Sequence, residues 1–554
     1  MELQPYLANA DKIYDPNCKM LGSVTHSPGY HTRIPDGQWA HQTRQALDYA
    51  LALLESGEPD HIARSVEVID HMVSLQDTDP TNGTYGIWSW YYEEPLDKMA
   101  PPDWNWADFC GARLIQILFR HEAKLPASTV SGIKSSIGHA AWSIFRRNVG
   151  PGYSNIAVMG GGVALAVGEI LGEPRLVDYA RGRLQNIVSH HKRHGDFNEY
   201  NSPNYTLVVL DEAERFLEVV SDETGRQALE AIRKAAWQAI ADHFHPPTQQ
   251  WSGPHSRFYS DRLSVSGAAF LSERLGFQIK PHVPPGADTT VTDVALGKYL
   301  PCPPELRERF LRLPEPEYTI RKRFILADSE ADSTYGTTWF SDAATLGSVN
   351  KGGFWNQHRP LIGYWSAPDE PTVVLRLRFL HDGRDFASVG IRTAQDGARA
   401  LSIVGLQKGF GDFHVSLDLP PGGAFHATDF RLRYELTGVG ATAADLGDGI
   451  YALSCGDRKA VVTVLPSQFD GHAVRWEIGE DDGRAYLDGI CYAGPRKGFH
   501  LDDVADTYLP IATEIASSSA PLTTVKPTVA IADGIVSAAW SVGNGLNVAA
   551  PVKP

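Results

Sequence analysis

The feature that most constrains the fold is a repeated unit, a pair of amphipathic helices joined by a short polar connection. Apolar residues recur with the 3.6-residue period of a helix over 38–56 and again over 60–75, with Gly57 and Pro59 between them. Such a pair predicts an antiparallel helical hairpin. Further pairs are predicted at 106–121 with 128–147, 156–171 with 174–190, and 205–220 with 225–243, and a single helix is predicted at 261–275.

Serial hairpins from about Gly37 to Gly276 predict an α/α toroid, complete or incomplete, with a cleft at the ends of its inner helices. The units share their architecture but no fixed-period repeat of residues. Within the predicted helix at 156–171, three consecutive glycines (160–162) lie in an apolar stretch. They indicate close helix packing and not a phosphate-binding loop.

After Pro281 the chain changes character, because Pro and Gly become frequent and short alternating segments replace the helical period. These segments, bounded by turn signals such as 381–383 and 481–483, predict an antiparallel β-sandwich; they lie at 372–380, 387–393, 400–404, 431–436, 460–465 and 474–478. We therefore predict a multidomain protein, α then β. A helical toroid covers 1–280, a linker or transition covers 281–332, and a sandwich covers 333–554.

Composition narrows the class of function. With 554 residues and 43% hydrophobic content, the chain is expected to form more than one core. The formal charge of −16 argues against nucleic-acid and membrane-surface binding, although a polyanion is still accepted where positive charge gathers locally. The five cysteines are far apart, so we expect free thiols and neither a disulfide framework nor a cysteine zinc site. The sequence shows neither a signal peptide nor a membrane span, and we expect a cytoplasmic protein unless the sequence has been trimmed.

The segment 189–205 is the first candidate site. It places three His, a Lys and an Arg at the end of a helix, and a polar stretch follows before the next helix. The alternative interpretation is that the basic residues complement the helix dipole while Asn201 or Ser202 caps the next helix. The histidine spacing could suit a divalent ion, but adjacent His at a helix end is more often solvated, so no metal and no cofactor are predicted. The candidate binding residues here are Arg193, His194, Glu199, Tyr200 and Asn201.

Five other segments hold candidates. Asn155 precedes a helix, where it is either an N-cap or an amide donor to a substrate carboxylate. The loop 251–259 combines turn residues with His, Arg and Tyr, which favours a site, although a lone His or Arg is more often structural. The aromatic-rich segment 354–365, expected as a strand, carries polar groups that a β domain would lend to a cleft between domains, although packing against the helical domain is the alternative. Their candidates are His255, Arg257 and Tyr259 in the first, and Gln357, His358 and Arg359 in the second. Most tryptophans of 88–94 and 102–108 are expected in the core, with sugar stacking by one or two of them, Trp90 and Trp104.

At these residues the chain resembles the polysaccharide lyases that join an α/α toroid to an antiparallel β domain, the heparinase II/III-like and alginate-lyase-like group. The resemblance implies that Asn155, in Tyr153-Ser154-Asn155, neutralises a uronate carboxylate. It also implies that Tyr205, in Ser202-Pro203-Asn204-Tyr205, acts as acid, base or both, with His255 or His358 assisting. Relatives have His where this chain has Ile156 or Asn201, so the identity of the base stays open.

The implied reaction is β-elimination at a uronic acid of a polysaccharide or oligosaccharide. Asn155 and an arginine (Arg257, Arg193 or Arg359) would stabilise the developing charge while a base removes the C5 proton and an acid protonates the leaving oxygen. A glycoside hydrolase on the same scaffold is the first alternative, because it needs two carboxyl groups and Glu199, Asp196, Asp103 and Asp108 are available. A non-catalytic carbohydrate-binding protein is the second alternative. The lyase prediction requires that one cleft brings together Asn155, Glu199, Tyr205, His255 and His358.

Overall fold

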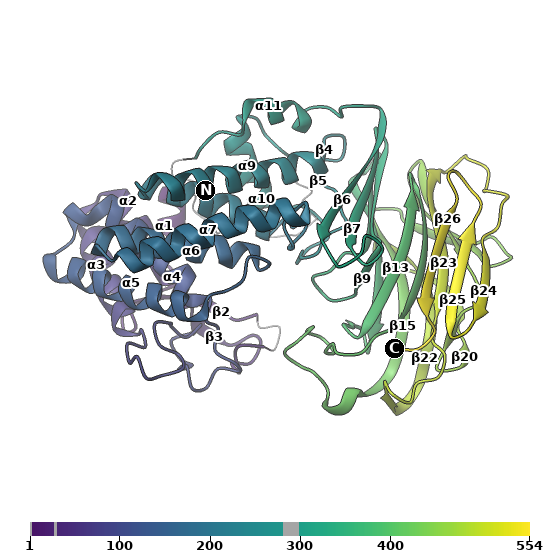
Figure 1. Ribbon diagram of the computed structural model, residues 1–554, viewed down its shortest axis with the longest axis horizontal. Coiled ribbons are helices and arrows are strands. Elements are labelled where there is room, and N and C mark those ends of the chain that lie inside the picture. The colour runs from purple at the N-terminus through teal and green to yellow at the C-terminus, as the bar shows by residue number, and fades with distance from the viewer. Residues whose placement is uncertain (1–2, 27–29, 281–298) are drawn as a thin grey trace.

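The computed structural model describes residues 3–26, 30–280 and 299–554. A helical half is followed by a half built from antiparallel sheets, and the two lie side by side along the long axis of the molecule (Figure 1). The predicted fold class, α/α toroid followed by antiparallel β-sandwich, is confirmed.

The helical half consists of hairpins at the predicted places. Successive pairs are α2 (Thr43–Ser56) with α3 (Pro59–Ser74), α4 (Trp106–His121) with α5 (Ala127–Arg147), α6 (Ser154–Leu171) with α7 (Pro174–His194), and α8 (Tyr205–Val219) with α9 (Glu223–His243), followed by α10 (Val265–Leu275). Helices α2, α4, α6 and α8 contact one another in that order, as do α3, α5, α7 and α9. The hairpins thus form two layers of an incomplete toroid. Since every second helix runs in the same direction, α4, α6 and α8 begin at the same end of their layer.

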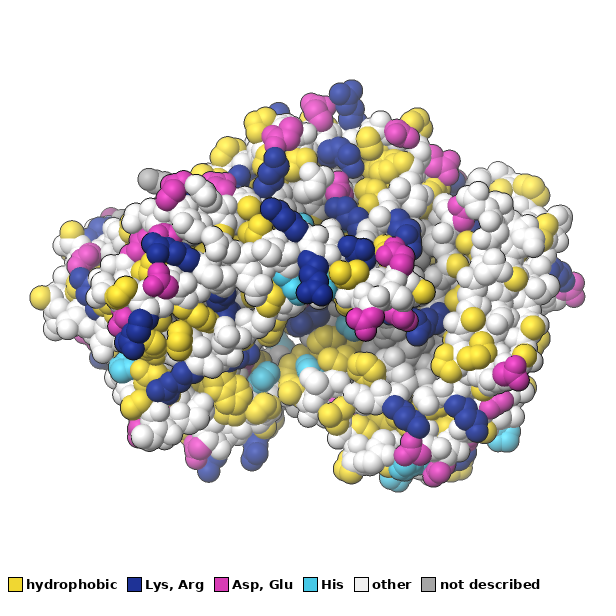
Figure 2. All heavy atoms as spheres, in the orientation of Figure 1, with side chains coloured by type: hydrophobic (Ala, Val, Ile, Leu, Met, Phe, Trp, Pro, Cys, Tyr) yellow, Lys and Arg dark blue, Asp and Glu magenta, His cyan; other side chains and the backbone are white. Residues whose placement is uncertain are grey.

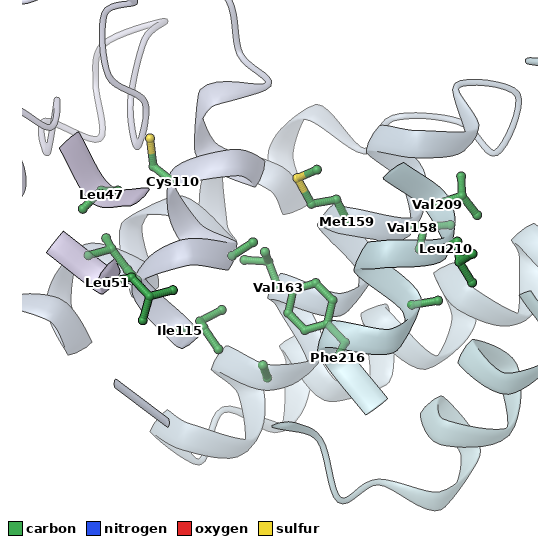
Figure 3. Close-up of a cluster of buried hydrophobic side chains, with 14 of the residues drawn as sticks. Leu47, Leu51, Cys110, Ile115, Val158, Met159, Val163, Val209, Leu210 and Phe216 are labelled. Atoms are coloured by element: carbon green, nitrogen blue, oxygen red, sulfur yellow. The ribbon is translucent and has the colours of Figure 1, made fainter. Parts of the chain in front are cut away.

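Helix α6 lies at the centre of the helical core. Its side chains Val158, Met159 and Val163 pack among those of the neighbouring inner helices (Figure 3). The predicted close packing at the glycines is confirmed, because a Cβ at Gly162 would lie 2.0 Å from the ring of Phe216 on α8. By length and composition α6 could cross a membrane, but 83% of its 18 residues are buried inside the protein, as in the core helix of a globular domain.

Short elements that the helical pattern did not predict precede and follow the hairpins. Near the N-terminus, α1 (Leu3–Ala10) leads into a three-stranded sheet of β1 (Tyr14–Asp15), β2 (Met20–Val24) and β3 (Trp39–His41). After α9, β4 (Phe244–His245) and β5 (Gln250–Trp251) form a small hairpin that leads into the loop carrying His255 and Arg257.

The β half is built from antiparallel sheets. In the described part of the chain the largest has nine strands: β6 (Glu317–Ile325), β7 (Thr334–Ser341), β8 (Ala344–Val349), β10 (Leu361–Ala367), β11 (Glu370–His381), β12 (Arg384–Asp385), β15 (Ala424–Thr437), β21 (Arg475–Asp481) and β22 (Arg484–His500). A seven-stranded sheet packs against it: β9 (Lys351–Gly353), β13 (Val389–Asp396), β14 (Arg399–Leu406), β16 (Thr442–Asp445), β17 (Ile450–Cys455), β18 (Arg458–Val464) and β23 (Leu509–Ser517). The pair β19 (Gln468–Phe469) and β20 (His472–Ala473) forms a small hairpin.

A third layer covers the seven-stranded sheet. Strands β24 (Thr528–Ala532), β25 (Ile535–Trp540) and β26 (Leu546–Pro551) pack their apolar side chains on Leu401 and Ile403 of β14 (Figure 1, yellow). The β half begins earlier than the expected boundary at 333. Strand β6 pairs with β7 from Glu317 onward, after α11 (Pro304–Arg307), so it lies inside the range expected as linker. Residues 281–298 of that range lie outside the described residues.

Candidate functional site

A cavity of about 630 Å³ lies where the helical and sheet halves meet. Figure 2 shows the surface hollowed between the halves, with basic, histidine and apolar side chains around the hollow. The charged and titratable residues that line the cavity are Glu199, Arg257, Lys351, Arg392, His255 and His358. Glu199 is the one acid among these described lining residues, so the wall is locally positive in a protein with a formal charge of −16.

Glu199 fastens the loop before α8 to the start of α6. Its Oε2 accepts hydrogen bonds from the backbone N of Asn155 at 3.0 Å and from the Asn155 side-chain Nδ2 at 2.7 Å. Burial raises the pKa of Glu199, while the Arg257 guanidinium and the Asn155 donors lower it. The carboxyl group therefore occupies the anion-favouring end of a helix. Asn155 Oδ1 is buried and has no partner among the described residues.

Arg257 joins the two halves of the molecule. Its Nε donates to Gln357 Oε1 at 2.6 Å, its Nη1 lies 3.3 Å from Glu199 Oε1, and its Nη2 donates to the Tyr205 hydroxyl at 2.9 Å. The guanidinium also stacks over the rings of Tyr205 and Trp355, 4.5 and 5.1 Å from their centroids. A planar group with five donors can make all these contacts at once, whereas a point-like ammonium cannot.

Tyr205 is the first residue of α8, and Ser202 Oγ accepts its backbone N–H at 3.0 Å. Its hydroxyl lies 2.5 Å from that of Tyr259, which is 54% exposed. Burial raises the pKa of Tyr205, and the charge of Arg257 opposes this rise. The phenol therefore keeps its proton near neutral pH, beside a cation that would stabilise its ionised form.

Two histidines line the cavity as neutral imidazoles. Burial lowers the pKa of His255 to about 3 and that of His358 to about 4. His255 Nδ1 pairs with the Asn201 carbonyl at 2.6 Å, and His358 Nδ1 pairs with the Gly353 carbonyl at 2.9 Å. Since a carbonyl only accepts, each Nδ1 carries the hydrogen and each Nε2 holds a free lone pair. His255 Nε2 is fully enclosed and unbonded among the described residues, whereas His358 is only partly buried.

A chain of ring contacts connects this cluster with the first inner helices. From the sheet half, Trp355 contacts His414 with ring centroids 4.9 Å apart, and His414 contacts Tyr30 at 4.7 Å. From Tyr30 the contacts continue through His31 to Trp90, which stacks on Trp106 at 5.1 Å. Flat rings of this kind are suited to sugar faces.

The structure brings Asn155, Glu199, Tyr205, Arg257 and Gln357 together through direct contacts, and His255 and His358 line the cavity beside them. Tyr259 joins the group through Tyr205, and Trp90 lies in the ring contacts between His31 and Trp106.

Other predicted binding residues lie in packing positions. The Tyr200 hydroxyl bonds to His243 Nε2 at 2.8 Å, and its ring stacks on Phe324, so this side chain is buried between the two halves. Asn201 donates to the carbonyls of Ser252 and Pro254 and thereby holds the loop after β5.

Arg359 is also a packing residue, because its buried guanidinium pairs with Asp261, which Arg376 contacts as well. Arg193 is exposed at the end of α7, and its carbonyl accepts from Arg323 of β6; the His194 Nδ1 accepts the backbone N–H of Leu326. Trp104 donates to the Gly83 carbonyl. Arg193, His194 and Trp104 do not line the cavity in the part of the chain that the structure describes.

Sequence reasoning missed several residues of the cluster: Tyr30, His31, Tyr153, Trp355 and His414. The Tyr153 hydroxyl accepts from Asn105 Nδ2 at 3.2 Å, and the Tyr30 hydroxyl contacts Gln357. Tyr153 and Trp355 each lie two residues before a predicted site residue, Asn155 and Gln357, so this proximity could have identified them. Tyr30 and His414 come from irregular segments without any local pattern.

Fold and site together define a class, a helical toroid joined to a β-sandwich with a basic, aromatic site where they meet. A family model described as a domain of unknown function, DUF8769, matches residues 4–272. No curated protein matches the chain.

Among solved structures, the chain is similar to "Crystal Structure of Heparinase III", with 11% identity and a TM-score of 0.43 over 96% of this chain and 85% of that chain. It is also similar to a heparinase III with methylated lysines, with 8% identity and a TM-score of 0.38 over 100% and 92%. Values this low do not transfer an activity, so the contacts described above have to support any proposed function.

Proposed function

We propose that the protein is a polysaccharide or oligosaccharide lyase that cleaves a uronic-acid-containing glycan by β-elimination. The observation that carries the proposal is the Arg257 cluster, in which one guanidinium bridges Glu199, Gln357 and Tyr205 beside two neutral histidines. Such a cluster combines a fixed cation, a protonated phenol and an unprotonated imidazole, which are the groups an elimination next to a carboxylate requires.

The charge of the cavity supports an acidic substrate. Arg257, Lys351 and Arg392 line it against the single carboxyl group of Glu199. The N-termini of α6 and α8 add the partial positive charge of two helix dipoles. Asn155 Nδ2 uses one hydrogen for Glu199, so its second hydrogen is free to donate to a uronate carboxylate.

We assign the base to His358 and the acid to Tyr205. His358 Nε2 takes the C5 proton, and the charge that develops on the carboxylate is stabilised by Arg257 and Asn155. The C4–O bond then breaks as the C4–C5 double bond forms, and the Tyr205 hydroxyl gives its proton to the leaving oxygen. Arg257 stabilises the resulting phenolate until solvent reprotonates it, and the His358 imidazolium releases its proton to solvent. Glu199 acts as a positioning residue for Asn155 and Arg257.

Hydrolysis is less well supported, because it needs a second carboxyl group facing the bond. Of the four acids proposed for that role, Glu199 is the one that lines the cavity in the described part of the chain. Asp196 pairs with Lys322 at 3.5 Å, and Asp103 accepts from the Trp90 indole at 3.2 Å. Asp108 is buried between inner helices, where burial raises its pKa to about 7.

A panel of acidic polysaccharides and their oligosaccharides tests the proposal. We expect products that absorb in the near ultraviolet, because elimination leaves a double bond conjugated with the carboxylate. New reducing ends without this absorbance would instead indicate hydrolysis, and binding without any product would indicate a carbohydrate-binding protein. Either result would refute the lyase assignment.

A further inference from the structure

The small N-terminal sheet brings together three side chains that are distant from the Arg257 cluster in sequence. Asp15 ends β1, Cys18 lies in the turn to β2, and His41 ends β3. The pairing of β2 with β1 and β3 places them side by side, with Asp15 opposite Met20 and His41 opposite Gly22. One ligand atom from each of the three lies within 4.8 Å of the other two.

His41 presents an unused nitrogen to this group. Its Nδ1 bonds to Glu93 Oε1 at 2.5 Å, whereas its Nε2 is buried and has no hydrogen-bond partner among the described residues. The side chain is 9% exposed, so water is largely excluded from it. A buried polar atom without a partner calls for an explanation. A carboxylate on one ring nitrogen is also the usual support of a metal-bound imidazole, because it fixes the hydrogen there and leaves the lone pair on the other nitrogen.

Asp15 and Cys18 each place a possible ligand atom near the Nε2 of His41. Asp15 Oδ1 accepts from the backbone N and the Nδ2 of Asn17, at 2.8 and 3.0 Å, while its Oδ2 lies 3.7 Å from His41 Nε2. That separation is too long for a hydrogen bond. Cys18 is a buried free cysteine, and its sulfur makes a 3.9 Å contact with the Asp15 carbonyl.

We propose that Asp15, Cys18 and His41 bind a zinc ion, with Glu93 as the positioning residue of the imidazole. A donor set of one nitrogen, one sulfur and one oxygen is typical of zinc. Zinc bonds of about 2.0–2.3 Å in a tetrahedron separate the ligand atoms by roughly 3.5 Å, close to the spacing of Asp15 Oδ2 and His41 Nε2. The Cys18 thiol releases its proton to solvent as the Zn–S bond forms, and water completes the fourth position.

The site lies beside the segment 90–93, which backbone hydrogen bonds already join to the end of β3: Thr43 N–H donates to the Trp90 carbonyl and Tyr92 N–H to the His41 carbonyl. His41 lies two residues before the start of α2, and its backbone N–H donates to Glu93 Oε2 at 3.1 Å. Glu93 belongs to the segment that carries Trp90, one of the rings contacting His31. The ion therefore links the turn between β1 and β2 to His41, and the Glu93 contact of His41 extends this connection to the segment that holds Trp90. No sequence motif marks the site, because its ligands are 3 and 23 residues apart, from 15 to 18 and from 18 to 41.

Cobalt substitution of the full chain tests the site. Protein stripped with a chelator is titrated with Co²⁺, and we expect one equivalent to bind with a thiolate charge-transfer band in the near ultraviolet and tetrahedral bands in the visible. Zinc should displace it. Cys18→Ser should lose the charge-transfer band, and Glu93→Gln should weaken zinc binding about 10- to 100-fold. Cys491→Ser, which changes a cysteine of the sheet half, is the matched control and should leave the spectrum unchanged.

Two outcomes would overturn the proposal. The first is folded wild-type protein, verified by circular dichroism, that binds no stoichiometric Co²⁺ or Zn²⁺. The second is a charge-transfer band that persists in Cys18→Ser. If Cys18→Ser fails to fold, Asp15→Asn replaces it, and unchanged zinc affinity in that variant would also overturn the site.

Discussion

At the scale of single residues, the Tyr205 hydroxyl lies between Arg257 Nη2 and the Tyr259 hydroxyl. Tyr205→Phe removes this hydroxyl with little change in volume, so the fold should persist. If Tyr205 is the acid, kcat should fall by about 10²- to 10⁴-fold. Tyr259→Phe, which removes the exposed partner, is the control and should retain most activity. Steady-state kinetics with the best substrate of the panel makes the comparison, and near-normal turnover of Tyr205→Phe would exclude it as the acid.

Substitution of Arg257 tests whether the reaction requires the geometry of its guanidinium or only its positive charge. Arg257→Lys keeps the positive charge but cannot reach Glu199, Gln357 and Tyr205 together. We expect kcat/KM to fall about 10²-fold or more, on the scale seen when one donor to a developing negative charge is lost. Arg193→Lys, at the exposed end of α7, is the control. Equal kcat/KM values for the Arg257→Lys variant and the wild type would show that charge alone suffices.

His358 predicts the acid limb of the pH profile. Its pKa is lowered by burial to about 4, so the imidazole stays neutral as the pH falls from 7 and becomes protonated only near 4. Because kcat/KM reports groups of the free enzyme, its acid limb should lie near pH 4 and not near 6.5. His358→Asn should abolish most turnover, while His500→Asn, an exposed histidine of the sheet half, should not. A limb near 6.5 would point to a solvated base instead.

At the scale of elements, the approach of α6 to α8 fixes the relative positions of Asn155 and Tyr205. Gly162→Ala would drive a Cβ into the Phe216 ring, which lies 2.0 Å from the ideal position. Overpacking of this kind costs about 1–3 kcal/mol or more, and activity should fall as the two helix starts shift. Gly182→Ala on α7 meets no atom within 4 Å and should stabilise the protein by up to about 1 kcal/mol. Denaturant unfolding of both variants measures the contrast, and equal stabilities would contradict close packing.

The elements were predictable because their signals are local. The helical period and the glycine and proline stops gave α2 through α10 within a few residues, and the alternating segments gave β11, β13 and β14. The site was predictable in part, since Asn155 and Tyr205 start parallel inner helices and therefore lie at one end. Arg359 and Arg257 were equally good candidates from the sequence. The partner of Arg359, Asp261, comes from a loop 98 residues away, and no local pattern reveals that pairing.

At the scale of the whole molecule, four histidines whose pKa is lowered, three of them buried and His358 partly buried, make stability depend on pH. Burial lowers the pKa of His243, His245 and His358 to about 4 and that of His255 to about 3. In the unfolded chain each would titrate near 6.5. Between these values the unfolded state binds protons that the folded state does not, so each histidine's contribution is complete above about 6.5 and is lost as the pH falls toward 4. Asp108 has the opposite effect on stability as the pH falls, because its pKa is raised to about 7 in the folded protein, but it is a single group.

His245 isolates one of these contributions, because it lies away from the Arg257 cluster and its Nε2 pairs with the Ser341 carbonyl, which connects the two halves. His245→Gln keeps a donor but cannot be protonated. We expect the variant to be less stable at pH 7 and to lose less stability on acidification. The wild-type free energy of unfolding should approach that of the variant by about 1.4 kcal/mol per pH unit between 6.5 and 4. Denaturant unfolding at several pH values gives both curves. Parallel curves would mean that His245 is already charged in the folded protein and is not shielded from solvent between the helical and sheet halves.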